Sequence, residues 1–461
     1  MIKRKFLIPL GITTYFIIVL LACNLSTDNA PPTVVPRATN TPPPTIGYAT
    51  LAPEELPQVA TAPAPEQRTE AVLLTLLNQV QPDRMMATIT ALQNMTTRHM
   101  ASGYDNTTRG IGGAAQYIND QFVQIQSQSS GRFNVTQQEF LANWGDGQIV
   151  GRNVIGVLSG TETGAGVIVV GGHYDSVSNV FDDPNAPAPG ANDNASSIAA
   201  LIEIARIMSQ TPHRATILFV AFGAEEFQRQ GSIAFVRDYL QQYNIPVNAM
   251  INMDIIGSST AGNGATEDNR MRLYSANPNE SPSRQFARML NLYAERYVAS
   301  MSLELQTGAD REGRYSDHMS FSDAGIAAVR LIEYLEDSTR QHTNRDTVEA
   351  IRPAYLANAT RTILASLTAL ASGPRAPRSV QLRDNGNGLR TLVWEISPDA
   401  QGYVVALREP GSIIYNATFE TNTNMVEWEG FTPDRFEGIA IAGIDADGLM
   451  GPFSFEYRIS N

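Results

Sequence analysis

Hydrophobic and polar positions in the middle of the chain follow two alternating patterns. Short β-branched apolar runs predict buried strands, and apolar residues at three- and four-residue spacing predict amphipathic helices. The predicted strands lie at 166–172, 216–222, 250–255, 272–275 and 327–332, and the predicted helices at 195–210, 231–242, 283–297 and 354–371. Two further helical patterns begin near residue 67 and cover 113–126. This alternation predicts an α/β fold, a three-layer αβα sandwich with a mainly parallel central sheet.

The pattern changes after residue 373. Residues 377–459 hold about seven short alternating runs separated by Gly, Asn, Asp and Pro, a strand density typical of a β-sandwich. The order of Trp394, Gly402-Tyr403 and the late GIDADGLMGPFS segment resembles a fibronectin type III module. We therefore predict an α/β domain over 67–373 and a small all-β sandwich over 374–461.

The N-terminal residues have the pattern of an export signal. Lys3, Arg4 and Lys5 precede an apolar stretch that ends just before Cys23, the only cysteine of the chain. Because Cys23 stands at the expected cleavage point, residues 1–22 are predicted to be a lipoprotein signal peptide; an uncleaved membrane anchor is the alternative. Residues 23–66 are rich in Pro and Thr and predict an extended linker.

The net charge of the chain limits the kinds of partner that it is expected to bind. The formal net charge is −13, and removal of residues 1–22, which carry both lysines of the chain, would make it −16. An acidic chain without lysine disfavours nucleic acid and polybasic contact with lipid as partners. We expect a monomer outside the cytoplasm, on the bacterial cell surface, tethered only through lipid on Cys23.

Five segments concentrate metal-binding residue types. Each presents His, Asp or Glu beside small residues, and most follow an apolar run: GGHYDS (171–176), GANDNAS (190–196), FGAEEF (222–227), NMDIIG (252–257) and QHTNRDT (341–347). Carboxylates and imidazoles bind Zn²⁺ where no thiolate is offered. Open α/β sheets bind ligands at the carboxyl ends of their strands, so these segments predict a metallohydrolase.

The order and spacing of the five segments, over about residues 67–371, resemble the bacterial secreted zinc aminopeptidases, relatives of glutamate carboxypeptidase and glutaminyl cyclase. The resemblance implies two Zn²⁺ ions and peptide substrates. It implies that Asp193 bridges the metals, that His173 and Asp254 complete one site, and that Glu226 and His342 complete the other.

The same resemblance assigns two supporting roles and one backbone feature. Glu225 would be the general base, and Asp175 would accept the ring N–H of His173 and orient it. The peptide bond between Asp193 and Asn194 is expected to be cis.

Other functions of the same fold stay open. A carboxypeptidase should present arginines to a C-terminal carboxylate, for which Arg311, Arg314 and Arg340 are candidates. A glutaminyl cyclase typically works with one zinc, and a non-catalytic binding protein should lack ligands. Tyr315 is a candidate for stabilising the oxyanion, and His318 is expected to give structural support.

Overall fold

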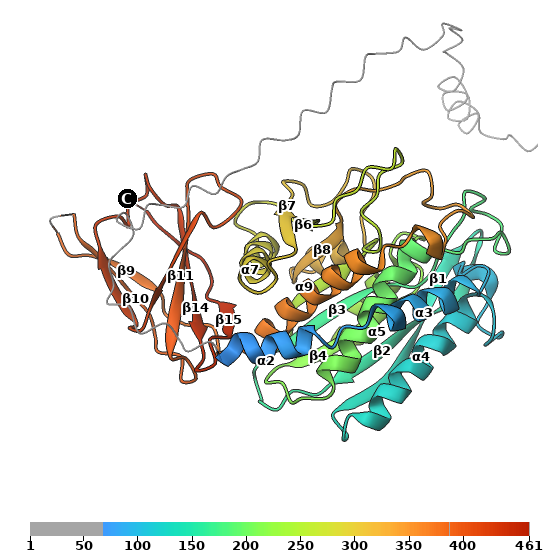
Figure 1. Ribbon diagram of the computed structural model, residues 1–461, viewed down its shortest axis with the longest axis horizontal. Helices are drawn as coiled ribbons and strands as arrows, with labels where there is room; N and C mark the ends of the chain where they lie inside the picture. The colour runs from blue at the N-terminus through green and yellow to red at the C-terminus, as the bar shows by residue number, and fades with distance from the viewer. Residues whose placement is uncertain (1–67, 387, 461) are drawn as a thin grey trace, which may run out of the picture. The chain divides into compact units, whose positions relative to one another are not determined.

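The computed structural model describes residues 68–386 and 388–460. The predictions for the signal peptide, Cys23 and the linker lie outside these residues. Within the described ranges, no helix is long and apolar enough to cross a membrane. An αβα sandwich comes first and a small antiparallel β-sandwich follows it (Figure 1), which confirms the predicted fold class.

A central eight-stranded sheet organises the first part. Its strands are β1 (Phe133–Trp144), β2 (Gly147–Leu158), β3 (Val167–His173), β4 (Thr216–Phe222), β5 (Val247–Met253), β6 (Arg270–Ser275), β7 (Ser302–Leu305) and β8 (Ala327–Glu333). Their spatial order is β1-β2-β4-β3-β5-β8-β6-β7. The four adjacent strands β4, β3, β5 and β8 are mutually parallel, whereas β2 pairs antiparallel with β1 and β4, and β6 with β8. The centre of the sheet is therefore parallel and its flanks are mixed.

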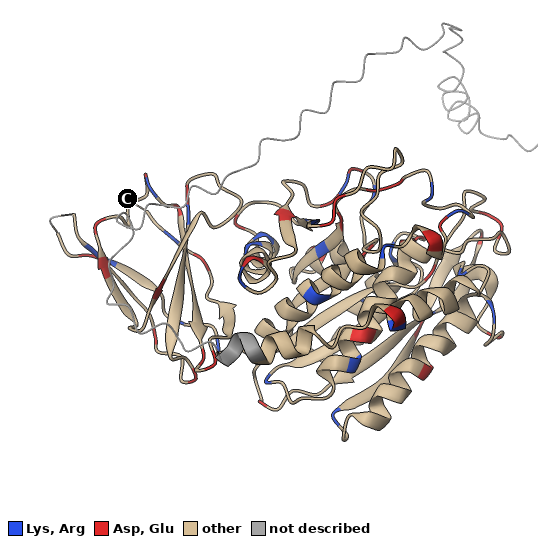
Figure 2. Ribbon diagram, in the orientation of Figure 1, with Lys and Arg blue, Asp and Glu red and all other residues tan. Residues whose placement is uncertain are grey.

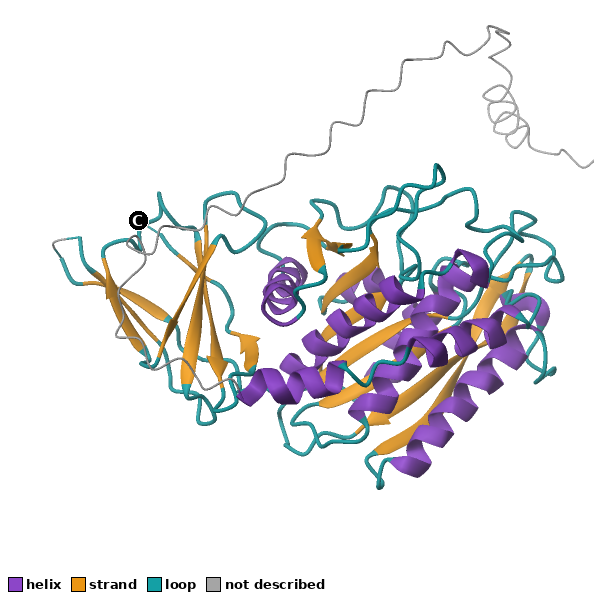
Figure 3. Cartoon of the chain, viewed as in Figure 1, coloured by secondary structure: helices purple, strands orange, loops and turns teal. Residues whose placement is uncertain are grey.

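Helices cover both faces of this sheet, and Figure 3 shows those on the face toward the viewer. They are α2 (Arg68–Leu77), α3 (Pro82–Gln93), α4 (Gly110–Gln128), α5 (Ser196–Met208), α6 (Gln230–Ala234), α7 (Pro282–Tyr297), α8 (His318–Asp323) and α9 (Pro353–Ser372). Ile168 and Val170 pack in the core under α3, α4, α5, α7 and α9, while Val169 packs in a second core with Phe235 and Phe321. The continuous apolar run of β3 thus reflects burial on both faces.

Two stretches differ from the pattern-based prediction. The α-helix expected over 231–242 ends at Ala234, and a wider π-type turn continues to Leu240. The five-residue spacing of the buried side chains Phe235 and Leu240 accounts for this widening, because it suits a π-type turn better than an α-helix. The β1–β2 hairpin was also unpredicted, because polar residues interrupt its apolar positions.

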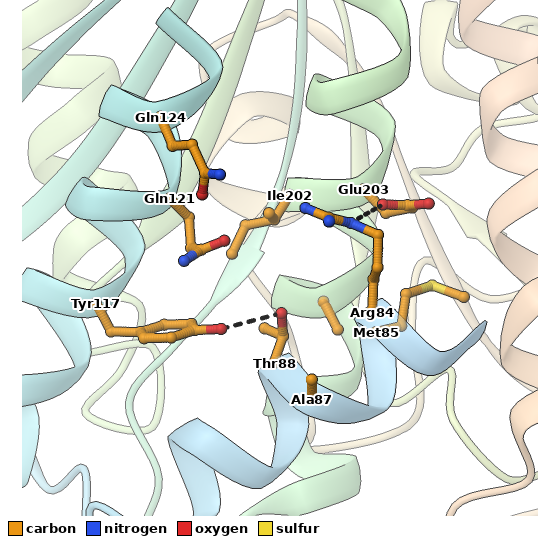
Figure 4. A pocket seen from close by; sticks show the side chains of 10 residues that line it. Arg84, Met85, Ala87, Thr88, Tyr117, Gln121, Gln124, Ile202 and Glu203 are labelled. Carbon is orange, nitrogen blue, oxygen red and sulfur yellow. Dashed lines mark hydrogen bonds and ion pairs between the residues drawn. The ribbon is translucent and has the colours of Figure 1, made fainter. Parts of the chain in front are cut away.

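A polar groove lies among α3, α4 and α5 (Figure 4). Tyr117 Oη donates to Thr88 Oγ1 at 3.2 Å, and Arg84 Nε lies 3.6 Å from Glu203 Oε2. Glu203 also accepts hydrogen bonds from Arg206. These polar groups are already paired, so the groove is a seam of helix packing.

Two antiparallel sheets form the β-sandwich after α9. Their strands are β9 (Gln381–Asp384), β10 (Arg390–Val393), β11 (Gly402–Arg408), β12 (Ala417–Thr421), β13 (Met425–Trp428), β14 (Gly438–Ile444), β15 (Met450–Phe453) and β16 (Tyr457–Arg458). One sheet has the order β13-β10-β9 and the other β12-β11-β14-β15, with β16 also pairing with β14. The fibronectin type III identity of this sandwich stays a prediction.

Strands β11 and β14 of the five-stranded sheet are buried on both faces. Val405 and Leu407 of β11 pack in the core of the sandwich, whereas Val404 and Ala406 join the core of the αβα domain. Tyr293 Oη of α7 donates a buried hydrogen bond of 2.7 Å to the main-chain carbonyl of Gly451. Few charged side chains lie along the strands (Figure 2), as such two-sided burial requires. The sandwich is thus packed against the domain that carries the metal-ligand segments.

This packing leads to a stability prediction. Tyr293→Phe leaves the buried carbonyl of Gly451 without its donor, so we expect the free energy of unfolding to fall by about 1–3 kcal/mol. Tyr243→Phe is the control, because Tyr243 is 58 % exposed, and it should change that free energy by less than about 0.5 kcal/mol. Urea denaturation of both variants checks this. Equal midpoints for the two variants would refute the role of the Tyr293 hydroxyl.

Candidate metal centre

The predicted ligands follow the carboxyl ends of the parallel strands. His173 is the last residue of β3, Asp254 follows β5 directly, and Glu226 lies four residues after the end of β4. His342 belongs to the loop that follows β8. Because these strands are adjacent and parallel, their carboxyl ends meet at one edge of the sheet.

All five predicted ligands converge there in two sets. Donor atoms of His173, Asp193 and Asp254 lie within 4.8 Å of one another, and so do those of Asp193, Glu226 and His342. Asp193 belongs to both sets. This is the arrangement expected for two metal ions that share one carboxylate.

The hydrogen bonds of His173 show which ring nitrogen faces the centre. Nδ1 lies 3.1 Å from the main-chain carbonyl of Asp175, an acceptor, so Nδ1 carries the hydrogen. Nε2 lies 3.3 Å from Asp193 Oδ1 and 3.5 Å from Asp254 Oδ1. In the neutral imidazole, therefore, a lone pair faces two carboxylate oxygens, and positive charge at this position, on a bound metal ion or as a proton, makes the contact favourable.

In the second donor set an imidazole nitrogen again faces two carboxylate oxygens. His342 Nε2 lies 3.3 Å from Asp193 Oδ2 and 3.1 Å from Glu226 Oε1. Glu226 Oε1 is buried without a hydrogen-bond donor among the described residues. Ligands bound tetrahedrally at about 2.0–2.1 Å from zinc lie about 3.3 Å apart. The donor set and its separations thus fit Zn²⁺.

Electrostatics point the same way. The charge of Glu226 raises the pKa of His342 to about 11 against the opposing effect of burial. Burial would lower the pKa of His173, but Glu225 and the neighbouring aspartates outweigh it and raise that pKa well above its usual range. Both pKa shifts have the same cause: the surrounding carboxylates stabilise positive charge at the centre.

Glu225 lies beside the ligands with its carboxylate 11 % exposed. Its Oε2 is 3.9 Å from His173 Nε2. Burial raises the pKa of Glu225 well above its usual range, and the charges of Asp254 and Glu226 add to the effect of burial. A carboxylate whose pKa is raised in this direction is suited to accept and return a proton near neutral pH.

Asp175 approaches His173 with both its main chain and its side chain. Its main-chain carbonyl lies 3.1 Å and its carboxylate Oδ1 3.5 Å from His173 Nδ1. The two carboxylate oxygens also accept the main-chain N–H groups of Glu225 and Glu226, each at 3.1 Å. Asp175 thus contacts the histidine and also holds the main chain of the glutamate pair.

The backbone is unusual where it presents these side chains. Ala224, Ile255 and His342 have positive φ angles of 58°, 63° and 54°. Such conformations cost non-glycine residues about 1–3 kcal/mol each and cluster at functional sites. The peptide between Asp193 and Asn194 is cis, as expected.

Arg330 was not identified from the sequence. It is fully buried, and its Nη2 lies 2.9 Å from Asp254 Oδ2. Its Nη1 lies 2.9 Å from Oδ1 of Asp310. An arginine in the middle of the apolar strand AAVRLIE is a sequence signal for such a buried partner.

The ligands open into a cavity of about 250 Å³. Tyr315, half exposed, lines it together with Gln228, Arg311 and Arg314. His318 does not line it; its Nε2 donates to the carbonyl of Ala309 at 3.0 Å, as the expected structural support would. The cavity lies directly beside the predicted ligands, all five of which line it.

An αβα sandwich that gathers two histidines and three carboxylates at its strand ends has the architecture of a metal-dependent hydrolase. Residues 153–367 match the model of peptidase family M28. A protein of Leptosphaeria maculans named as a probable zinc metalloprotease is 30 % identical over 365 residues, 72 % of this chain and 84 % of that protein. The chain belongs to peptidase family M28.

Solved structures share the fold. The LapA aminopeptidase of Legionella pneumophila superposes with a TM-score of 0.52 at 21 % identity, over 67 % of this chain and 77 % of that one. The glutaminyl cyclase of Fimbriiglobus ruber superposes with a TM-score of 0.50 at 19 % identity, over 63 % and 95 %. At these identities the likeness concerns the fold alone.

The hydrogen bonds of Asp175 lead to a prediction. Asp175→Asn keeps the shape but replaces one acceptor by an NH₂ group, so one of the two glutamate N–H groups loses its partner. We expect the affinity for Zn²⁺ to fall by about 10–100-fold, measured by competition with a chelator. Asp182→Asn, an exposed change in the same loop, is the control. Equal zinc affinities for the two variants would contradict the assignment.

Proposed function

We propose that this protein is a zinc-dependent aminopeptidase that removes N-terminal residues from peptides. The observation that carries the proposal is the pair of donor sets joined by Asp193, with Glu225 beside them. His173, Asp193 and Asp254 would hold one Zn²⁺, and Asp193, Glu226 and His342 the other. Two zinc ions, when bound, would supply Lewis-acid activation of water and of the scissile carbonyl.

The proposed role of Glu225 follows from its environment. Its carboxylate would take a proton from the attacking water and pass it to the leaving amine. Burial favours the protonated form of this group, so the proton can be held between the two steps. Asp175 fixes the main chain of Glu225 and so the direction of its side chain.

The charged side chains around the cavity favour the N-terminal end of a peptide over its C-terminal end. The carboxylates Glu225, Glu226 and Asp254 line the cavity and suit a free α-ammonium group. Of the three arginines considered for a C-terminal carboxylate, Arg311 is paired with Glu336, and Arg340 lies 3.3 Å from Asp337 and does not line this cavity. Arg314 lines the cavity and donates to Gln341 Oε1 at 2.8 Å. Two of the three candidates are therefore neutralised by acidic partners. This supports an aminopeptidase over a carboxypeptidase.

A glutaminyl cyclase and a non-catalytic binding protein are both less well supported. A glutaminyl cyclase typically uses one zinc, whereas both donor sets are complete here. A non-catalytic binding protein would have no need of a buried Glu225 beside an intact ligand set. We further propose that the enzyme acts outside the cytoplasm, tethered through Cys23.

The substrate prediction is tested with one peptide in four forms: free, N-acetylated, C-amidated and blocked at both ends. We expect hydrolysis of the free and C-amidated forms only, because the free amine is what the carboxylates recognise. Chelation of zinc should abolish the activity, and added Zn²⁺ should restore it. Cleavage of the acetylated peptide that is lost on amidation would instead identify a carboxypeptidase.

The general base is tested by Glu225→Gln. The amide cannot accept a proton, so kcat should fall by at least about 100-fold while the protein keeps its zinc. Zinc content by mass spectrometry and kcat on the free peptide are measured together. Glu429→Gln, an exposed change in the β-sandwich, is the control for loss of charge. An unchanged kcat in Glu225→Gln would refute its role.

A further inference from the structure

Arg98 is a fully buried guanidinium bound by main-chain carbonyls. It lies between α3 and α4 and donates hydrogen bonds to the carbonyls of Leu92, Tyr174, Pro189 and Gly190, at 3.3, 2.7, 2.5 and 2.8 Å. Burial lowers its pKa to about 10, against the opposing effect of nearby carboxylates, of which Asp346 is the largest. The side chain therefore remains charged at neutral pH.

Arg98 binds carbonyls in two of the segments that carry predicted ligands. One segment presents His173, and the other presents Asp193, the carboxylate that both donor sets share. Tyr174 directly follows His173, and Gly190 lies three residues before Asp193. The main chain strengthens the link, because the N–H of Arg98 donates to Ser176 Oγ at 3.1 Å and the N–H of Ser176 donates to the carbonyl of Arg98 at 3.2 Å. One side chain thus connects the strand end that presents His173 to the loop that presents Asp193.

Asp346 binds the same loop at its other end. Its Oδ1 accepts the N–H of Asn192 and its Oδ2 the N–H of Asp193, each at 2.9 Å. Its main-chain carbonyl accepts the N–H of Ala191, also at 2.9 Å. The loop 189–193 therefore turns its carbonyls to a buried cation and its amides to the two side-chain oxygens of Asp346, both of which accept. The bonds from the guanidinium are charge-assisted and therefore strong.

The loop is shaped for this contact at Gly190. Its φ is +53°, and a Cβ built there would lie 2.6 Å from Arg98 Nη2 and 2.7 Å from Ser176 Cβ. A side chain at position 190 would displace the guanidinium. The absence of one allows the cation to reach the main chain.

We propose that Arg98, which lies before the region matched by the family model, and Asp346 are positioning residues that fix Asp193 relative to His173 and so set the affinity of the centre for zinc. The inference rests on the proposed zinc-dependent function. Neither residue touches the cavity where the peptide would bind. They act through the main chain of the loop between them.

Arg284 offers a matched control for Arg98. It is also a buried guanidinium bound by main-chain carbonyls, those of Ser275 at 3.2 Å, Thr307 at 2.9 Å and Gln306. Burial lowers its pKa to about 10 as well. These carbonyls belong to none of the ligand segments. Arg284 also donates to Asn277 Oδ1 at 3.0 Å, so the two arginines are similar in burial and main-chain partners and differ in the segments that they hold.

The test compares Arg98→Lys with Arg284→Lys. Lysine keeps the charge but cannot serve several carbonyls with a planar fork, so both variants should melt at lower temperature. Only Arg98→Lys should raise the Kd for Zn²⁺, by about 10–100-fold, measured by chelator competition on folded protein. The inference is overturned if the zinc Kd of Arg98→Lys matches that of Arg284→Lys.

Two further measurements cover the cases in which Arg98→Lys does not fold or the unmodified protein binds no zinc. If Arg98→Lys does not fold, Asp346→Asn replaces it, since the isosteric amide can accept only one of the two N–H groups; a wild-type zinc Kd in folded Asp346→Asn overturns the inference. Failure of the unmodified protein to bind Zn²⁺ would refute the proposed function itself. If the unmodified protein binds Zn²⁺ and the variants bind it with the same Kd, only the positioning role is refuted.

Discussion

The centre depends on one unfavourable contact that a cation reverses. The Nε2 atoms of His173 and His342 face the oxygens of Asp193, and each also faces a further carboxylate. Without positive charge between them, these acceptors would repel one another in a buried site. The rest of the domain keeps them together: parallel strands end at one edge, and loops with strained φ angles turn the side chains inward.

Buried charges behind the ligands make that convergence possible. Arg330 neutralises the far oxygen of Asp254, and Asp175 holds the main chain of both glutamates. Arg98 and Asp346 hold the loop of Asp193 from opposite ends. Each of these groups is paired, so the fold accepts their burial, and each fixes a ligand without occupying a coordination position.

The sequence predicted the parallel centre of the sheet well, because buried strands such as β3 and β4 are uninterrupted apolar runs with clear ends. It missed the β1–β2 hairpin, where the signal was the two-residue Gly145-Asp146 turn and not the apolar pattern. The predicted ligands carry chemistry in their residue types, and motif order therefore sufficed to predict a set of residues that the fold brings together. Arg98 could not be found in this way, because its partners are carbonyls, which every residue possesses.

The central claim is that Asp193 is shared by two zinc ions. Anomalous diffraction at the zinc edge, from crystals of the metal-loaded protein, tests it directly. We expect two peaks, one among His173, Asp193 and Asp254 and the other among Asp193, Glu226 and His342. A single peak, or two peaks of which one lies away from Asp193, would contradict the account.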